Sequence, residues 1–417
     1  MSHRQAEDKS IMPAIIQFPT VVEEALKTYG DSFPNQPERQ HLGEYLTGLM
    51  VAPRKSVRGI NSEFADTTDQ SCLNRWLVEV DWDAQALNEH RLKELQKDST
   101  TRYSPSRGVI PIDNVLIDHE GKTIEDVGWF WDHADQRHLI AHDYVIANYV
   151  CPSGKHYPLE FRRFQKKDQV PKEDFKDHNQ LARELVDWVY EHKIPGDFTF
   201  DSYFTNALNL NHIQAKGRAY VGDLKFNRKL VFKGQEIKAS EVAHQLPPEE
   251  RKEIVIGGKS QYYFTHTVRI PAVDHPVRLV ILWKRPQDQE PTKVLVTNRT
   301  YWEITRVLMV YRHRWTGTET FHRDGKQHLG MGDCQVRKGQ GQTRHMYLVF
   351  LAYSLLMGQL KQGHAQEWAF VKLTTIGEAC RAVMRETLAK TLSWAIDRAI
   401  KHQWSTPRIC HALGLAA

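Results

Sequence analysis

The chain of 417 residues is 41% hydrophobic and 26% charged, which fits a globular protein of two or three domains and excludes a disordered or fibrous one. The longest apolar run, which starts at Met346, is shorter than the ~20 residues that cross a bilayer. The N-terminus lacks the apolar core of a signal peptide, and the five cysteines are scattered without a C-x-x-C pair. We therefore expect a cytoplasmic protein with reduced thiols, no membrane segment and no structural zinc site.

The net charge of +5 is unevenly distributed along the chain. Residues 205–417 carry 32 Lys and Arg against 17 Asp and Glu, whereas residues 1–204 carry 24 basic and 34 acidic side chains. A surplus of 15 positive charges in one half predicts a polyanionic partner, most simply DNA. A solvated basic surface without a partner is the alternative.

Helical periodicity runs from residue 13 to about residue 100, and the polar link STTRYSPSRG closes this region. Three stretches rich in β-branched and aromatic residues follow, then an amphipathic helical pattern and another strand. The order strand, strand, strand, helix, strand predicts a mixed α/β unit that starts with an antiparallel meander. In chain order the stretches are VIPIDNVLID, HLIAHDYVIANYV, KHYPLEFRRF, HNQLARELVDWVYEHK and FTFDSYF. Strand-like sequence returns between Lys229 and Asn298, and helical periodicity resumes at Trp302 and continues to the tail.

Two aspartates lie inside apolar strand patterns. Asp113 occurs in VIPIDNVLID and Asp201 in FTFDSYF, where a buried carboxylate is costly unless it is paired or binds a cation. A structural salt bridge explains either residue alone. Because one aspartate precedes and the other follows the predicted crossover helix, both can end on adjacent strands of one sheet, where two close carboxylates are tolerated when a divalent metal lies between them.

Glu319 is an isolated acid in the basic stretch YRHRWTGTETFHRDGKQHLG. Residues three, four and seven apart on a helix share a face, so Arg312, Arg323 and Lys326 are expected around it, a suitable wall for a phosphate backbone. Glu319 could then supply a third metal ligand. The alternative is that Thr316 and Glu319 form a T-x-x-E capping box at a helix start.

These residues together resemble the DDE transposases of bacterial insertion sequences, in the cut-and-paste group with a β-rich insertion. That group has the pattern Tyr, two residues, Arg, three residues, Glu, six residues, Lys. Here Tyr311, Arg314, Glu319 and Lys326 match it, with four residues instead of three before Glu319. VIPIDN and FDSYF, with the later YVGDLKFNRK, are similar to the segments that carry the first two acids.

The resemblance implies an α/β ribonuclease-H-like catalytic core interrupted by a β-rich insertion, with an N-terminal helical domain and a helical C-terminal tail. Asp113, Asp201 and Glu319 would hold two Mg²⁺ ions, with Mn²⁺ as a substitute, and catalyse DNA cleavage at transposon ends and strand transfer. Double-stranded DNA and a homodimer on DNA are the implied partners. The implied regions are 1–105 (helical, DNA-binding), 106–228 (core, first part), 229–300 (β-rich insertion), 301–360 (core with the glutamate helix) and 361–417 (helical C-terminal region).

Tyr311, Arg314, Arg323 and Lys326 are the implied DNA contacts, and Trp283 or Trp302 could stack on a flipped base. A buried or interface tryptophan is the alternative for each. HEGKT lacks the first glycine of a P-loop, so no nucleotide cofactor is expected.

Asp118 and Asp223 remain possible substitutes for the two predicted aspartates. Two other functions stay open: a metal-dependent nuclease on the same fold, and a DNA-binding relative that has lost catalysis.

Overall fold

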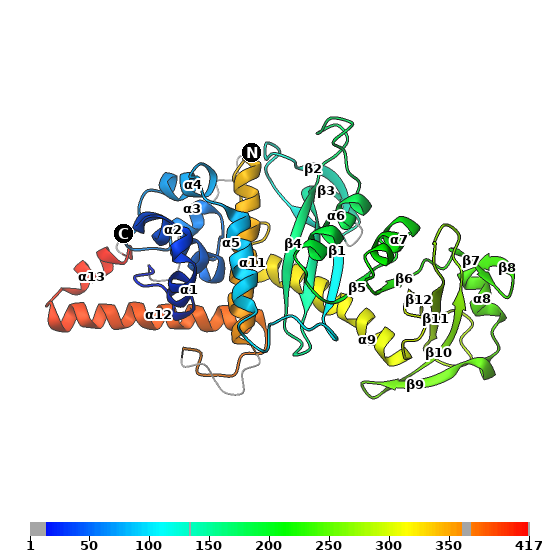
Figure 1. Ribbon diagram of the computed structural model, residues 1–417. Helices are drawn as coiled ribbons and strands as arrows, with labels where there is room; N and C mark the ends of the chain where they lie inside the picture. Colours follow the sequence, from blue (N-terminus) through cyan, green and yellow to red (C-terminus); the bar gives the residue numbers. More distant parts are fainter. Residues whose placement is uncertain (1–13, 133–134, 361–367, 416–417) are drawn as a thin grey trace. The chain divides into compact units, whose positions relative to one another are not determined.

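The computed structural model describes residues 14–132, 135–360 and 368–415, so the first residues of the predicted N-terminal region and parts of the predicted C-terminal region lie outside it. The described chain divides into two compact units (Figure 1). One unit comprises Thr100–Leu116 and Asp143–Phe321. The other comprises the chain up to Ser99, Ile117–His142 and the chain from His322 onward.

The first of these units is built on a mixed sheet in which the strands β4, β3, β1, β5 and β6 are neighbours in that order. The β3–β4 pair is antiparallel, whereas β1 with β5 and β5 with β6 are parallel. This arrangement matches the predicted strand order, although a further strand, β2 (Gly128–Asp132), lies between β1 and β3 in the chain. The five strands are β1 (Val109–Asp118), β3 (Arg137–Val150), β4 (His156–Phe164), β5 (Asp197–Phe200) and β6 (Tyr220–Asp223).

The predicted crossover helix is α6 (His178–Glu191), which packs on the sheet beside β4 (Figure 1). It starts at a capping box formed by Asp177 and Gln180, and its apolar face is buried. A shorter helix, α7 (Ala207–Ala215), connects β5 to β6. A helical crossover is what two parallel neighbouring strands require.

The β-rich segment extends the same sheet. Strand β12 pairs antiparallel with β6, and β11, β10 and β9 follow in order. The segment contains β7 (Lys229–Phe232), β8 (Gln235–Lys238), α8 (Ala239–Gln245), β9 (Lys252–Ile256), β10 (Lys259–Val268), β11 (Val277–Trp283) and β12 (Lys293–Thr297).

The basic stretch is helical as far as His328. Helix α9 (Ile304–Arg314) passes through a π-helical turn at Trp315–Glu319 into α10 (Thr320–His328). Val307 and Val310 on α9 join the core of the sheet with Val109 and Leu295. No helix starts at Thr316, so the capping-box alternative for Glu319 is wrong.

The other unit is mainly helical, as predicted for both ends of the chain. Helix α11 (Gly339–Gln359) is buried over most of its length, as expected for the longest apolar run. No helix within the described ranges is long and apolar enough to cross a membrane. The remaining helices are α1 (Thr20–Tyr29), α2 (Gln36–Val51), α3 (Val57–Asn61), α4 (Gln70–Val78), α5 (Ala84–Leu95), α12 (Ile376–Lys401) and α13 (Thr406–Ala412).

Candidate active site

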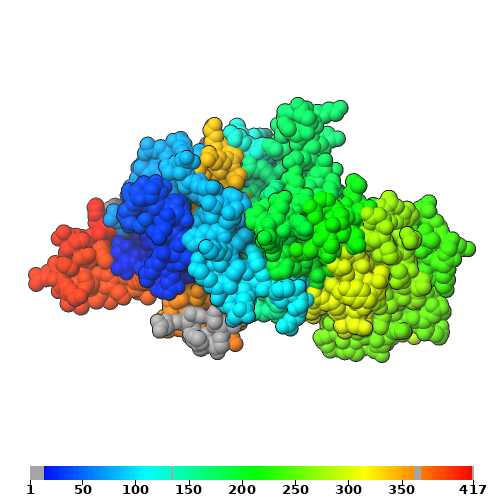
Figure 2. All heavy atoms as spheres, viewed as in Figure 1, coloured from blue at the N-terminus to red at the C-terminus, as the bar shows by residue number. Residues whose placement is uncertain are grey.

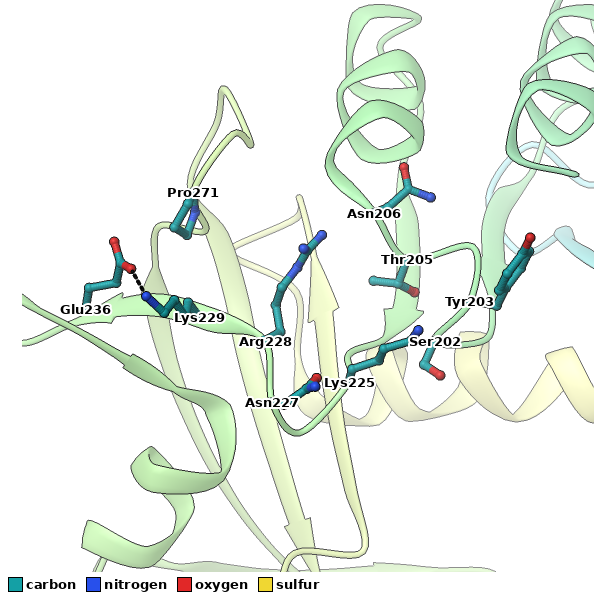
Figure 3. A pocket seen from close by; sticks show the side chains of 10 residues that line it. All are labelled: Ser202, Tyr203, Thr205, Asn206, Lys225, Asn227, Arg228, Lys229, Glu236 and Pro271. Carbon is teal, nitrogen blue, oxygen red and sulfur yellow. Dashed lines mark ion pairs between the residues drawn. The ribbon is translucent and has the colours of Figure 1, made fainter. Parts of the chain in front are cut away.

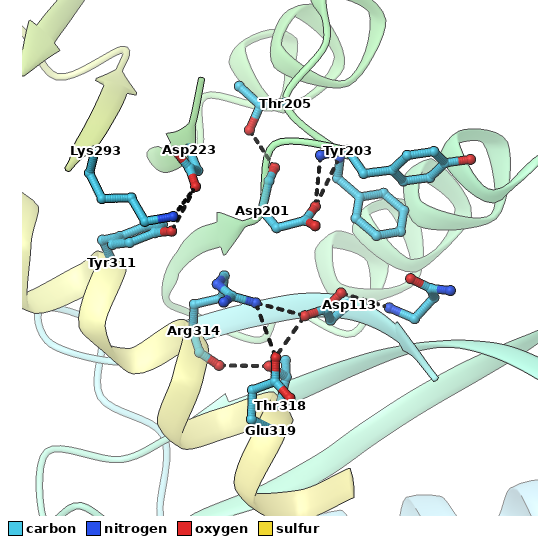
Figure 4. Close-up of polar contacts among 12 residues, drawn as sticks. Asp113, Asp201, Tyr203, Thr205, Asp223, Lys293, Tyr311, Arg314, Thr318 and Glu319 are labelled. Atoms are coloured by element: carbon cyan, nitrogen blue, oxygen red, sulfur yellow. Dashed lines mark hydrogen bonds and ion pairs between the residues drawn. The ribbon is translucent and has the colours of Figure 1, made fainter. Parts of the chain in front are cut away.

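Asp113 lies on β1, whereas Asp201 directly follows the adjacent parallel strand β5, so the prediction that Asp201 lies inside a strand is wrong by one residue. The register pairs Pro111 on β1 with Thr199 on β5, and two further residues bring Asp113 level with Asp201. Asp201 begins the turn after β5, where its Oδ1 accepts the backbone N–H of Tyr203 at 2.9 Å and of Phe204 at 3.2 Å (Figure 4). These bonds fix the Asp201 carboxylate beside the strand that carries Asp113.

Glu319 reaches the same place from the helix. The Arg314 guanidinium Nη1 donates to Asp113 Oδ2 at 2.9 Å and lies 3.7 Å from Glu319 Oε1, so one cation joins two of the acids (Figure 4). The three predicted acids are therefore brought together, with Arg314 among them.

The electrostatics of this cluster are unfavourable for Asp113. Burial raises the pKa of its carboxyl to about 7, with a further contribution from the nearby charge of Asp201. Arg314 lowers the pKa in part, and Glu319 raises it again. Three carboxylates against one guanidinium leave the cluster short of positive charge.

A divalent cation would supply the missing charge, and carboxylate oxygens are the ligands that Mg²⁺ prefers. Within the described ranges, no three His, Cys, Asp or Glu side chains are already arranged to hold a metal ion. The Arg314 guanidinium lies between Asp113 and Glu319 instead. The donor set thus fits a hard cation in chemistry and charge, and the side chains must shift to hold it.

Tyr311 and Asp223 form a second polar group beside the acids. Asp223, at the end of β6, accepts a 2.6 Å bond from Lys293 and a 3.1 Å bond from the Tyr311 hydroxyl (Figure 4). Burial and the neighbouring Asp223 raise the pKa of the Tyr311 phenol, so it stays protonated. Lys293 thus neutralises Asp223. This ion pair was not predicted from the sequence.

The other predicted residues lie in varied surroundings. Arg323 and Lys326 are exposed on α10, where Arg323 pairs with Asp324 at 2.9 Å. Trp283 is fully buried under the guanidinium of Arg251, so its ring is not presented to a DNA base in this conformation.

Trp302 and Asp118 complete the set of predicted and alternative residues. Trp302 is partly buried with Arg306 over its ring. Asp118 is an exposed acid that pairs with Arg137.

A polar hollow of about 470 Å³ is lined in part by Ser202, the residue that follows Asp201 in the sequence (Figure 3). Its basic wall consists of Lys225 and Arg228 in the loop after β6 and of Lys229, the first residue of β7. Lys229 pairs with Glu236 at 3.0 Å, whereas the side chains of Lys225 and Arg228 bond to none of the described residues. The opposite wall presents hydroxyl and amide groups from Ser202, Tyr203, Thr205 and Asn206.

Comparison with protein families gives two matches. The family described as "DDE superfamily endonuclease" matches residues 28–260, which is more than half of the chain. The family described as "Transposase DDE domain" matches residues 172–355. No curated protein matches the chain.

The pKa of Asp113 predicts a stability change on its substitution. Its folded-state pKa of about 7 lies above the ordinary value of 3.8, so the folded state binds the proton more tightly and loses stability as pH rises between these values. An asparagine carries no charge, so Asp113→Asn should gain about 3 kcal/mol relative to the wild type between pH 5 and pH 8.

Urea unfolding without divalent metal measures this difference. The matched control is Asp118→Asn, which removes an exposed carboxylate. If the unfolding free energies of the wild type and Asp113→Asn differ by the same amount at every pH in this range, the pKa of Asp113 is not raised in the folded state.

Proposed function

Because the chain belongs to the DDE superfamily of endonucleases, we propose that Asp113, Asp201 and Glu319 are its catalytic acids. The chain is a transposase of this superfamily, an enzyme of DNA transposition by cleavage and strand transfer. Enzymes of this superfamily generally use divalent metal. The observation that supports the assignment best is the convergence of the three acids around Arg314, from strand β1, the turn after the adjacent strand β5, and one helix.

Two Mg²⁺ ions held by the three carboxylates, with Mn²⁺ as a substitute, would supply the charge that activates water and stabilises the departing 3′ oxygen. Asp113 must be deprotonated to take part, since a protonated carboxyl is a poor ligand. Arg314 offsets the repulsion between the acids and the DNA phosphates. Tyr311 donates its only hydroxyl proton to Asp223 in this structure, so its proposed contact with a phosphate oxygen requires the Tyr311–Asp223 hydrogen bond to be exchanged for one to the phosphate.

The proposed substrates are the two ends of a bacterial insertion sequence and a target duplex. In this proposal residues 1–105 bind the end DNA, 106–228 and 301–360 form the ribonuclease-H-like core, 229–300 are the insertion, and 361–417 form the helical tail. Arg323 and Lys326, exposed on α10, are proposed phosphate contacts. We expect the enzyme to act in the cytoplasm of a bacterial host, where its DNA substrate lies.

The hollow after Asp201 is the proposed path of the DNA backbone next to the cut. Among the described residues, the side chains of Lys225 and Arg228 have no bonding partner, and they lie opposite neutral hydrogen-bonding groups, which suits a phosphodiester chain. Because Ser202 in this hollow directly follows Asp201, phosphates bound there would be close neighbours of the scissile one.

A homodimer on DNA is proposed because two ends must be processed together. Helix α12 supports this with a stripe of exposed apolar residues, and its C-terminal part stands out from the rest of its unit with α13 (Figure 2, red). The four-residue spacing of the stripe is that of an i±4n ridge, which packs against a like ridge at about −50° instead of forming a long coiled coil. The stripe consists of Met384, Leu388, Leu392, Ile396 and Ile400.

The catalytic assignment predicts metal-dependent cuts at both flanks of the gene. DNA carrying these flanks should be cleaved and joined to target DNA by the wild type with Mg²⁺ or Mn²⁺. Asp201→Asn and Glu319→Gln should each lose cleavage by about 10³-fold, the effect of about 4 kcal/mol of lost charge stabilisation. Asp118→Asn is the matched control and should cut normally. Cleavage by Glu319→Gln at the wild-type rate would contradict the assignment of Glu319 as a catalytic acid.

The proposed DNA path predicts a change in salt dependence. Lys225→Ala with Arg228→Ala should lower the slope of log affinity against log salt by about 2, because about one counterion is released per phosphate contact. Lys259→Ala with Lys284→Ala removes two exposed lysines of the insertion and is the control. Equal slopes for both double variants, measured by fluorescence anisotropy, would contradict the path.

The dimer surface predicts that Leu392→Glu with Ile396→Glu weakens assembly on DNA, because buried unpaired charges are costly. Light scattering of the protein with end DNA should then give a 1:1 complex where the wild type gives 2:2. The control is Arg385→Glu, which reverses a charge at an exposed position of α12 outside the stripe and should leave the 2:2 complex intact. A 2:2 complex for the stripe variant would rule out this surface.

A further inference from the structure

The helix that carries Glu319 contains one residue more than an α-helix can accommodate in its register. In the π turn at Trp315–Glu319, the N–H of Thr320 donates to the carbonyl of Trp315, five residues earlier, where an α-helix would use four. Arg314 and Glu319 are five residues apart, which in an α-helix is about 500° and would put them about 140° apart around the axis. They nevertheless share a face, with 3.7 Å between Nη1 and Oε1.

We propose that the π turn is the element that positions Glu319, and that Gly317 and Thr318 are its positioning residues. This inference rests on the proposed catalytic role of Glu319. The wider turn absorbs one residue, so that the acid still faces Arg314 and Asp113. Without it, the carboxylate would be rotated away from the other two acids.

Gly317 sets how closely the turn can approach the sheet. A Cβ at this position would lie 2.3 Å from Pro111 Cγ and 2.8 Å from Val150 Cγ2, both closer than real Cβ contacts. Pro111 is two residues before Asp113 on β1. Any larger residue therefore has to move the helix away from the strand that carries the first acid.

Thr318 connects the turn to that acid. Its side chain is fully buried, and its hydroxyl donates to the Arg314 carbonyl oxygen at 2.7 Å. The Thr318 hydroxyl oxygen also lies 3.5 Å from Asp113 Oδ2. A widened turn disturbs the regular ladder of helix hydrogen bonds, and the hydroxyl satisfies a carbonyl inside it.

Deleting one residue should be tolerated inside the π turn but not in the regular part of α9. Removing Thr316 leaves four residues from Arg314 to the glutamate, about 400° in an α-helix, or about 40° past a full turn. The π turn can then close to an α turn with Arg314 and the glutamate still on one face. Removing Arg312 instead leaves Arg314 and Glu319 five residues apart. Because the buried residues of α9 all precede Arg312, Arg314 is then rotated by about 100° relative to that buried face and leaves Asp113.

The experiment compares Mn²⁺-dependent cleavage of end DNA, DNA affinity and melting temperature for these two deletions. The Thr316 deletion should stay within about threefold of the wild-type cleavage rate, with a similar melting temperature. The Arg312 deletion should lower both the cleavage rate and the melting temperature, since a misplacement of about 1 Å already lowers the rate by about 10²-fold. Inactivity of the Thr316 deletion, with wild-type melting and DNA affinity, would overturn the inference.

Two point variants test the positioning residues. Gly317→Ala should lower kcat by about 10²-fold with unchanged DNA affinity, by the same misplacement. Thr318→Val should lower kcat while Thr318→Ser restores it. Equal kcat values for Thr318→Val and Thr318→Ser would show that the Thr318 hydroxyl does not position Glu319.

The cleavage rates test the catalytic role of Glu319, and the melting temperatures test the helix register independently. If Glu319→Gln cuts like the wild type, or if no protein in the series cuts, the catalytic role of Glu319 fails. The melting temperatures still decide the register claim in that case, because equal losses for the two deletions would contradict it.

Discussion

The burial of the Asp113 carboxyl beside two further carboxylates, those of Asp201 and Glu319, is the constraint on which the rest of this site depends. Asp113 is buried, and the charges of Asp201 and Glu319 add to the cost of ionising it. Arg314 supplies one compensating charge and contacts two of the three acids. A folded protein keeps such a cluster only when the surrounding structure holds it in place, and the cost in stability is typical of a functional site.

The sheet and one helix hold the three carboxylates together. Parallel pairing of β1 with β5 sets the two aspartates side by side, and Gly317 lets the helix approach β1 closely enough to bring the glutamate. The β-rich segment also takes part, because β12 pairs with β6 and brings Lys293 to Asp223. Asp223, which accepts the Tyr311 hydroxyl, is thereby neutralised by a lysine 70 residues further along the chain.

Much of this could be predicted from the sequence, because local patterns determine it. The order of strands and helices, the β-rich segment, the strand that carries Asp113 and the helix that carries Glu319 follow from periodicity and from a carboxylate in an apolar strand. Asp201 is expected inside a strand and instead begins the turn after β5, because its side chain accepts the N–H groups of that turn. The α/β fold prediction is confirmed. The π turn could not be predicted from periodicity, since a helix with one extra residue looks the same over short stretches. The Lys293–Asp223 pair needs knowledge of which strands become neighbours, and the burial of Trp283 needs the packing of the whole sheet.

The most direct test of the central claim is anomalous X-ray scattering from crystals of the protein with end DNA and Mn²⁺. We predict Mn²⁺ bound by the carboxylates of Asp113, Asp201 and Glu319, with the Arg314 guanidinium moved from between Asp113 and Glu319 toward a phosphate. Mn²⁺ bound at Asp223 or elsewhere, with the Arg314 bridge intact beside the scissile phosphate, would contradict it.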